Sequence, residues 1–266
     1  MTPGGRAWRI GSVPYLNGRP LVAWFREPTA PADLELTLDV PSSLAARLRG
    51  GDLDVALVSS VEAFRGEGVA VVSDIAIAAD GPVRSVGLLS RVPLDRVRHV
   101  AVDRSSLTSA ALLRVIYRRR YGIDLAYTTA EPNLPSMLET AEAAMLIGDP
   151  AMRNDDDLYF MDLGAAWKEL TGLPFVYAVW LARDDAAAKR LGPALRSARD
   201  WGLVRLEEIA ADWSKESGLP LAIAREYLTD VMHYDLSETK RRALETFREL
   251  CEACVVMTRT HPVRFL

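Results

Sequence analysis

The feature that most constrains the fold is a repeated alternation of short apolar runs with turns that start helices. Residues 8–13 and 54–58 are apolar runs, and residues 34–38 alternate apolar with polar side chains. Pro41-Ser42-Ser43 follows one run and Ser59-Ser60 another, and these residue types commonly begin helices. Strand followed by helix, repeated along a chain, predicts parallel strands joined by helical crossovers, which is the α/β class.

The same pattern begins again after Pro93. A strand is expected at 99–102, a helix opens at residues 105–109 and runs to about 121, and further strands are expected at 125–128 and 143–147. The extended stretches near 83–92 and 174–183 separate these units from the first set. From 186 to 256 the pattern is helical. We therefore expect two α/β lobes joined by a two-strand hinge, with a helical C-terminal segment.

The lobe boundaries follow from this pattern. Residues 1–90 and 180–266 are expected to form lobe 1, with the C-terminal helices covering it. Residues 91–179 are expected to form lobe 2. This arrangement is typical of proteins that close on a small ligand.

Charge and composition exclude few functions. The chain has 266 residues and a net charge of −4, with 32 basic and 36 acidic side chains. No clustered basic face suggests nucleic acid as a partner. The start of the chain is polar, and the apolar runs at 143–147 and 174–182 are too short to span a bilayer. We expect a cytoplasmic protein that makes no membrane contact.

The two cysteines, Cys251 and Cys254, have the spacing of a redox pair or of half a zinc site. However, they fall on the same helical stripe as Ala243, Leu244 and Phe247, which favours burial in a core. No second Cys or His pair lies nearby in the sequence to complete four ligands. No metal is therefore expected.

Candidate ligand-binding residues gather where the predicted strands end, because ligands of open parallel sheets bind beyond the carboxyl ends of the strands. Nearly all of these side chains are neutral hydrogen-bond donors. The candidates in lobe 1 are Ser12, Tyr15, Asn17, Arg19, Ser42, Ser43, Ser59 and Ser60. Those in lobe 2 are Ser105, Ser106, Thr108, Ser109, Gly148 and Asp149, and Ser85 lies on the crossing strand.

Each candidate also has a structural interpretation. Helix N-termini suit a carboxylate, but Ser and Thr also serve as ordinary N-caps. Arg19 is suited either to a bidentate carboxylate contact or to the solvated surface. Tyr15 is suited to core packing, Asn17 to a turn, and Asp149 to capping the next helix. The residues alone therefore predict a two-lobed binder of a small anion.

No nucleotide or nucleophile motif contradicts this prediction. The chain has no Gly-x-Gly-x-x-Gly turn, no P-loop and no Gly-x-Ser-x-Gly elbow. Aromatic side chains between 167 and 180 are suited either to the wall of an apolar pocket or to the core.

Taken together, the motifs resemble those of one family, the menaquinone-biosynthesis proteins of the futalosine route. The opening block and the block that ends in Trp180 are similar to the chorismate dehydratase branch in particular. The segments are IGSVPYLNGRPL at 10–21, VPSSL at 40–44, GDLDVALVSS at 51–60, DRSSLTS at 103–109, IGDPA at 147–151, DLG at 162–164 with Trp167, TGLPF at 171–175 and AVW at 178–180. The resemblance covers residues 10–183.

The resemblance implies a type II periplasmic-binding-protein fold used as an enzyme. It implies a carbon–oxygen lyase that converts chorismate to 3-[(1-carboxyvinyl)oxy]benzoate and water, with no cofactor. By position in the family motif and by donor chemistry, Asn17 and Ser85 are expected to act in catalysis. The residues expected to bind substrate are Ser12, Tyr15, Arg19, Ser42, Ser59, Ser106, Thr108, Ser109, Gly148 and Asp149. A monomer or a weak homodimer is expected.

Two other functions stay open at this point. One is the sister enzyme of the same pathway, a 1,4-dihydroxy-6-naphthoate synthase, although its usual opening motif differs from VPYLN at 13–17. The other is a cytoplasmic sensor that binds a small carboxylate without consuming it. A thiamine-precursor type of enzyme is less compatible, because such chemistry calls for a more reactive His or Cys than this sequence offers.

Overall fold

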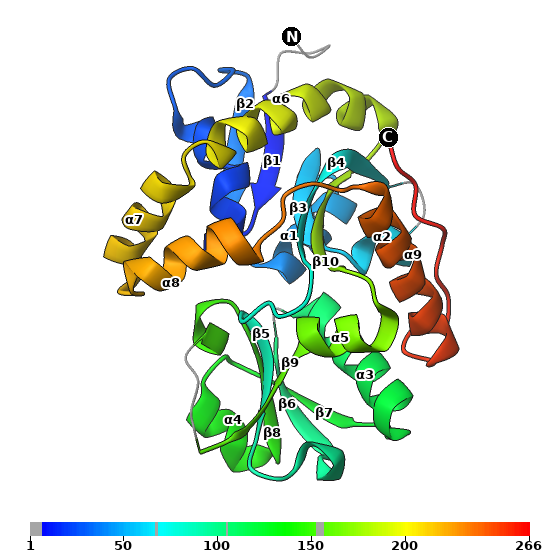
Figure 1. Cartoon of the computed structure of the whole chain (residues 1–266). Helices are drawn as coiled ribbons and strands as arrows, with labels where there is room; N and C mark the ends of the chain where they lie inside the picture. Colours follow the sequence, from blue (N-terminus) through cyan, green and yellow to red (C-terminus); the bar gives the residue numbers. More distant parts are fainter. Residues whose placement is uncertain (1–6, 67–68, 105, 153–156) are drawn as a thin grey trace. The chain divides into compact units, whose positions relative to one another are not determined.

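The chain divides into two units, each built around its own five-stranded sheet (Figure 1). The fold is given by a computed structural model that describes residues 7–66, 69–104, 106–152 and 157–266. The first unit comprises Met1–Ala78, Ala178–Ser237 and His261–Leu266. The second comprises Ala79–Tyr177 and Glu238–Thr260.

The sheet of the first unit has the strand order β2-β1-β3-β10-β4. Strand β1 pairs in parallel with β2 and β3, whereas β10 pairs antiparallel with β3. Their bounds are β1 Trp8–Ser12, β2 Leu34–Leu38, β3 Val55–Ser59, β4 Ala70–Ala79 and β10 Phe175–Ala182. All five residues of β3 are buried, as its unbroken apolar sequence predicts for a central strand.

Helices of several kinds complete the first unit. The α-helices are α1 Pro41–Arg49, α2 Glu62–Arg65, α6 Asp185–Leu203, α7 Leu206–Ser217 and α8 Leu221–Glu226. Two 3-10 helices, η1 Leu16–Leu21 and η2 Ala23–Arg26, follow β1, and a π-helix, η5 Tyr227–Val231, continues α8. Helix α6 lies very close to η1, because a Cβ atom on Gly202 would be 1.9 Å from the carbonyl oxygen of Pro20.

The sheet of the second unit has the order β7-β6-β8-β5-β9. Strand β6 is parallel to β7 and β8, and β5 is antiparallel to β8 and β9. The bounds are β5 Val86–Ser90, β6 His99–Asp103, β7 Ala126–Ala130, β8 Ala143–Ile147 and β9 Tyr159–Asp162. The helices are η3 Leu94–Arg96, α3 Leu107–Tyr121, α4 Leu134–Thr140, η4 Asp149–Met152, α5 Leu163–Thr171 and α9 Glu238–Ala253.

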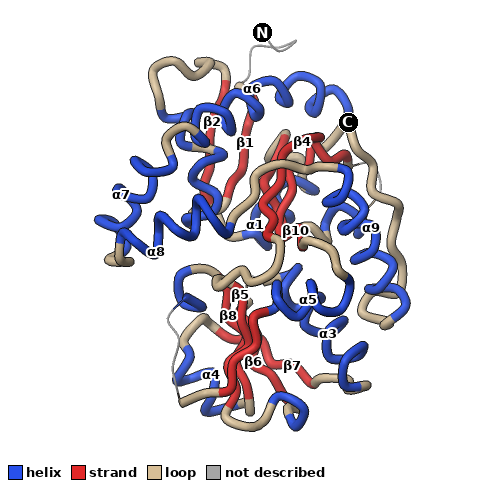
Figure 2. Tube along the Cα trace, viewed as in Figure 1, coloured by secondary structure: helices blue, strands red, loops and turns tan. Residues whose placement is uncertain are grey.

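Helices cover both faces of this second sheet (Figure 2). Met137 and Leu138 of α4 pack against Leu89, Ala144 and Leu146 in one buried cluster. The alternate residues of the same strands are also buried, so the opposite face is covered as well. Burial on both faces explains why these strands read as continuous apolar runs in the sequence.

The boundaries of the two units differ from the sequence-based division at two places. Residues 79–90 were expected in lobe 1, but β5 hydrogen-bonds between β8 and β9 and so belongs to the second sheet. The chain therefore leaves the first unit at Ala78, ahead of the 83–92 stretch, and returns at Ala178, inside the predicted 174–183 stretch.

Helix α9 is the second difference, since all the C-terminal helices were expected to cover lobe 1. The Phe247 ring contacts Phe175 at 4.9 Å and Trp167 at 5.7 Å between ring centroids. Residues 238–260 thus complete the core of the second unit. The predicted burial of both cysteines is confirmed, with Cys251 on α9 at 0% exposure and Cys254, directly after the helix, at 5%.

Candidate functional site

The first unit presents a set of polar side chains at the carboxyl edge of β1, β2 and β3. Ser12 ends β1 and is fully buried, and Ser59 ends β3. The Ser12 carbonyl accepts a hydrogen bond from Asp39 N at 3.0 Å, which fixes the turn from β2 into α1. Pro41 then occupies the first turn of α1, and Ser42 follows it, half-buried. The structure therefore brings Ser12 and the start of α1 to one edge, as the sequence predicted.

Helix η1 folds back over this edge. A Cβ atom on Gly18 would lie 2.9 Å from Val13 Cγ2 and 3.8 Å from Ser12 Oγ, so only a glycine allows this approach without a shift. Ser12 Oγ is buried, and no group in the described chain hydrogen-bonds to it. Tyr15, half-buried, precedes η1 in extended backbone.

Asn17 has an asymmetric environment on η1. Its Nδ2 donates to the hydroxyl of Tyr227 on the π-helix at 3.2 Å. Its Oδ1 is buried and has no partner among the residues that the structure describes. The side chain is thus held at one end and free to accept a hydrogen bond at the other. Tyr227 was not among the residues singled out from the sequence, and no local motif marks it.

Arg19 has a role that neither sequence interpretation included. Its Nη2 pairs with Glu216 Oε2 at 2.6 Å, and its guanidinium lies 4.7 Å from the centroid of the Trp213 ring. Both partners belong to α7. In this structure Arg19 therefore stabilises the packing of η1 against α7.

The second unit has a comparable polar edge. Because β5 is antiparallel to β8 with Val86 opposite Ile147, the residues before Val86 and after Ile147 are neighbours. Gly148 N donates to the Ser85 carbonyl at 2.8 Å, and Ser85 is 2% exposed. Gly148 has a φ of 67°, a conformation that strongly favours glycine.

Helix α3 begins at this same edge, since β6 is parallel to β8. Ser106 precedes the helix, and its N–H donates to the Asp103 carbonyl at 3.0 Å. Its Oγ is buried without a partner in the described chain and does not cap the helix. Thr108 and Ser109, in the first turn, are also buried. The capping interpretation therefore fails for Ser106.

True side-chain caps occur elsewhere, on α4, α5 and α6. They are made by Asn133, Asp162 and Asp184, whose side chains accept from a backbone N–H three residues on. The hydroxyl groups predicted to bind ligand are a different set. Ser105 and the side chain of Asp149 lie outside the described residues.

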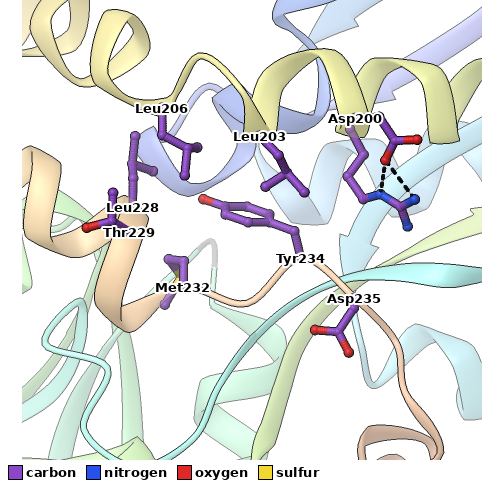
Figure 3. Close-up of a pocket in the computed structure, with 9 residues that line it drawn as sticks. Asp200, Leu203, Leu206, Leu228, Thr229, Met232, Tyr234 and Asp235 are labelled. Carbon is purple, nitrogen blue, oxygen red and sulfur yellow. Dashed lines mark hydrogen bonds and ion pairs between the residues drawn. The ribbon is translucent and has the colours of Figure 1, made fainter.

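Two cavities are lined by residues of the first unit that the structure describes, and they differ from the edge just described. One, of about 420 Å³, is lined by residues of α6, α7, η5 and the segment after it (Figure 3). The Tyr234 hydroxyl lies toward Leu206 and Leu228, and burial raises the pKa of this phenol. The other, of about 590 Å³, is lined by Arg19, Arg26, Arg205 and several acidic side chains. Neither is lined by Ser12 or Asn17.

The aromatic residues between 167 and 180 are core residues. Trp167 and Trp180 are fully buried, and Trp167 Nε1 donates to the Pro174 carbonyl at 3.0 Å. Phe175 and Tyr177 pack edge to face at 4.8 Å. Within the described ranges, no group of three or more His, Cys, Asp or Glu side chains is arranged to hold a metal ion, and no helix is long and apolar enough to cross a membrane.

The fold is that of the periplasmic binding proteins, which confirms the predicted fold class. A protein of Archaeoglobus fulgidus has a TM-score of 0.80 and 17% identity, with 96% of this chain and 100% of that chain covered. The aliphatic sulphonate binding protein of Escherichia coli has a TM-score of 0.65 and 16% identity, with 98% and 96% covered. A Candida albicans protein with the generic periplasmic-binding-protein fold has a TM-score of 0.64 and 12% identity, with 97% and 92% covered.

Within this fold, the chain belongs to the menaquinone biosynthesis family, whose model matches residues 8–253. The chorismate dehydratase of Thermus thermophilus is 30% identical over 264 residues, covering 92% of this chain and 95% of the relative. The chorismate dehydratase of Campylobacter jejuni is 27% identical, covering 92% and 97%. The family predicted from the motifs is thereby confirmed.

Proposed function

We propose that this protein is a chorismate dehydratase, a hydro-lyase that forms 3-[(1-carboxyvinyl)oxy]benzoate and water. The observation that carries the proposal is the full-length similarity to two chorismate dehydratases within one family. Both relatives have the dehydratase name, which favours this activity over that of the naphthoate synthase.

The donor chemistry of the two edges suits a substrate with two carboxylates. Buried hydroxyls and amide N–H groups stabilise small anions without a net positive charge, because desolvated dipoles act strongly in a low dielectric. Ser12, with its buried hydroxyl, supports a binding role in the first unit, and Ser106 supports one in the second. Tyr15, Arg19, Ser42, Ser59, Thr108, Ser109, Gly148 and Asp149 complete the proposed binding set.

The reaction is an elimination across two ring carbons. The hydrogen at C3 leaves as a proton, its electron pair forms the new ring double bond, and the hydroxyl at C4 leaves with its bonding pair. The proton and the hydroxide account for the water released. Aromatisation supplies the driving force, so the protein has to orient the substrate and stabilise the departing oxygen.

We propose that Asn17 and Ser85 hydrogen-bond to the departing hydroxyl of the substrate. The unpartnered Oδ1 of Asn17 is suited to accept from the substrate hydroxyl and so to fix its direction. The remaining N–H of the same amide and the Ser85 hydroxyl are suited to donate to the oxygen as negative charge develops on it. The enolpyruvyl carboxylate of the substrate is the proposed proton acceptor.

Turnover of chorismate by the purified protein tests the proposal, with products followed by chromatography and ultraviolet absorbance. Formation of the carboxyvinyloxy-benzoate without an added cofactor is the expected result. Chorismate that is bound tightly but not consumed would instead indicate a sensor. If chorismate is neither bound nor consumed, the naphthoate synthase activity would be favoured instead.

Single variants then test the roles of the two residues. Asn17→Ala and Ser85→Ala should each lower kcat far more than they raise KM, since both groups act on the leaving oxygen. Asn133→Ala is the matched control, because it removes an asparagine that only caps α4. Equal changes in kcat and KM for Asn17→Ala would mean that this residue only binds substrate.

Oligomeric state and location remain predictions. We expect a monomer or a weak homodimer, and analytical sedimentation would test this. We expect a cytoplasmic location, and cell fractionation would test this.

A further inference from the structure

Asp162 joins three segments of the second unit through one carboxylate. It ends β9 and caps α5, where its Oδ1 accepts from Ala165 N at 3.0 Å. The same carboxylate reaches the turn that precedes β5. Its Oδ2 accepts from Arg84 N at 2.7 Å and from Val83 N at 3.0 Å, and Oδ1 accepts from Val83 N at 3.1 Å.

The turn held in this way is the one that presents Ser85. Arg84 has a φ of 62°, a conformation that residues other than glycine adopt only where the surroundings impose it. Ser85 N donates to the Val83 carbonyl at 2.7 Å, and the Ser85 carbonyl accepts from Gly148 N. Ser85 is therefore fixed by Gly148 on one side and by the Asp162-bound turn on the other.

The strand pairing makes this reach possible. Gly87 of β5 lies opposite Asp162 of β9, so the carboxylate starts only a few residues from the turn. A charged acceptor forms stronger hydrogen bonds to backbone N–H groups than a neutral one does. An aspartate at this position can hold a strained turn and cap a helix at the same time.

We propose that Asp162 is a positioning residue for Ser85, which it holds in the backbone conformation that the elimination requires. The catalytic part of this inference rests on the proposed dehydratase function. The competing possibility is that Asp162 serves only as the N-cap of α5.

Asp162→Asn separates the two roles. Asparagine is as good an N-cap as aspartate, so Oδ1 can still accept from Ala165 N. The amide nitrogen that replaces Oδ2 cannot accept from Arg84 N. Asp184→Asn is the matched control, because Asp184 caps α6 through Ala187 N at 2.7 Å and contacts no proposed substrate-binding residue.

Two measurements distinguish the outcomes. Hydrogen–deuterium exchange should become faster at residues 83–85 in Asp162→Asn, with α5 unchanged, and should stay unchanged at these residues in Asp184→Asn. Turnover should fall by about 10-fold or more in kcat, with KM nearly unchanged, because small misplacements of a reacting group are costly. In a Ser85→Ala background, Asp162→Asn should have no further effect on kcat.

Three results would overturn the inference. They are unchanged exchange at 83–85, a kcat for Asp162→Asn equal to that of Asp184→Asn, and a full further loss of kcat in the Ser85→Ala background. Failure of the wild-type protein to consume chorismate would refute the dehydratase proposal instead. The exchange measurement would then still decide whether Asp162 holds the Ser85 turn.

Discussion

The side-chain nitrogen of Asn17 donates to the hydroxyl of Tyr227, although the two residues lie 210 positions apart in the sequence. The contact ties η1, directly after β1, to the π-helix near the end of the first unit. It also sets the orientation of the amide, with Oδ1 buried and unpartnered in the described structure. π-Helical turns often occur at functional sites, and this one supplies the hydroxyl that orients Asn17.

Tyr227→Phe should therefore impair turnover. The variant removes the acceptor for the Asn17 N–H, and the loss of one such hydrogen bond costs about 0.5–1.5 kcal/mol. We expect kcat to fall several-fold, since the amide can then rotate. Tyr117→Phe is the control, because it removes a buried hydroxyl that donates to the Leu94 carbonyl in the second unit. Equal kcat values for the two variants would show that Tyr227 does not orient Asn17.

Gly202→Ala should displace η1. The new Cβ would meet the backbone carbonyl of Pro20, which cannot rotate away as a side chain can. Overpacking of this kind destabilises by about 1–3 kcal/mol, and movement of η1 should also lower kcat. In the same helix, the Cβ of Gly192→Ala meets side-chain atoms alone, the end of Arg196 at 3.4 Å and Val72 Cγ1 at 3.6 Å. That variant should keep its melting temperature and its activity, and a similar loss in both variants would contradict the prediction.

Glu142→Gln should reduce the acid sensitivity of the second unit. Glu142 Oε2 accepts from Arg98 N and His99 N, and these backbone hydrogen bonds lower the pKa of the carboxyl group. Because the pKa of Glu142 is lower in the folded protein, its ionised carboxylate stabilises the fold at pH values above the ordinary pKa of 4.5. This stabilisation is lost as the pH falls through the pKa of the folded state. Urea unfolding between pH 3 and 7 should show a shallower acid decline in Glu142→Gln. Parallel curves for the variant and the wild type would rule the prediction out.

Cys251 should be unreactive in the folded protein. Burial, with a smaller effect of Cys254, raises the pKa of the Cys251 thiol to about 12. At pH 8 almost none of it is thiolate, and the thiolate is the reactive form. Mass spectrometry after iodoacetamide treatment should find Cys251 unmodified until denaturant is added. Rapid native alkylation would show that α9 opens readily.

Local sequence patterns predicted most of the strands. The runs at 54–58 and 143–147 correspond to β3 and β8, and both lie inside sheets where an unbroken apolar sequence is expected. Strand β9 was not predicted, because only four residues pair and two of them, Tyr159 and Phe160, are exposed. A short strand with an exposed start lacks the pattern on which the prediction depends.

The direction of the antiparallel strands could not be predicted from the local sequence. Alternating strands and helices predicted parallel strands, but gave no direction for the hinge stretches 83–92 and 174–183. These stretches contain β5 and β10, which run antiparallel to their neighbours. These two strands lie where the chain passes between units, so their direction depends on long-range pairing and not on a helical crossover.

The site was predictable in part for the same reason. The candidate hydroxyls at the ends of β1 and β3 and after β6 were singled out because strand ends can be read from the sequence. Tyr227 and Asp162 act through contacts with residues far away in the chain, 210 positions for Asn17 and 78 for Arg84. No spacing rule identifies such pairs from one sequence.

The place of α9 has a consequence for synthesis on the ribosome. Residues 79–177 emerge well before residues 238–260, yet Phe247 packs against Trp167 and Phe175 in the same core. The core of the second unit therefore stays incomplete, with aromatic surface uncovered, until residues 238–260 have been translated. The nascent protein is exposed to aggregation during that interval, and a chain that stops before α9 would remain in that state.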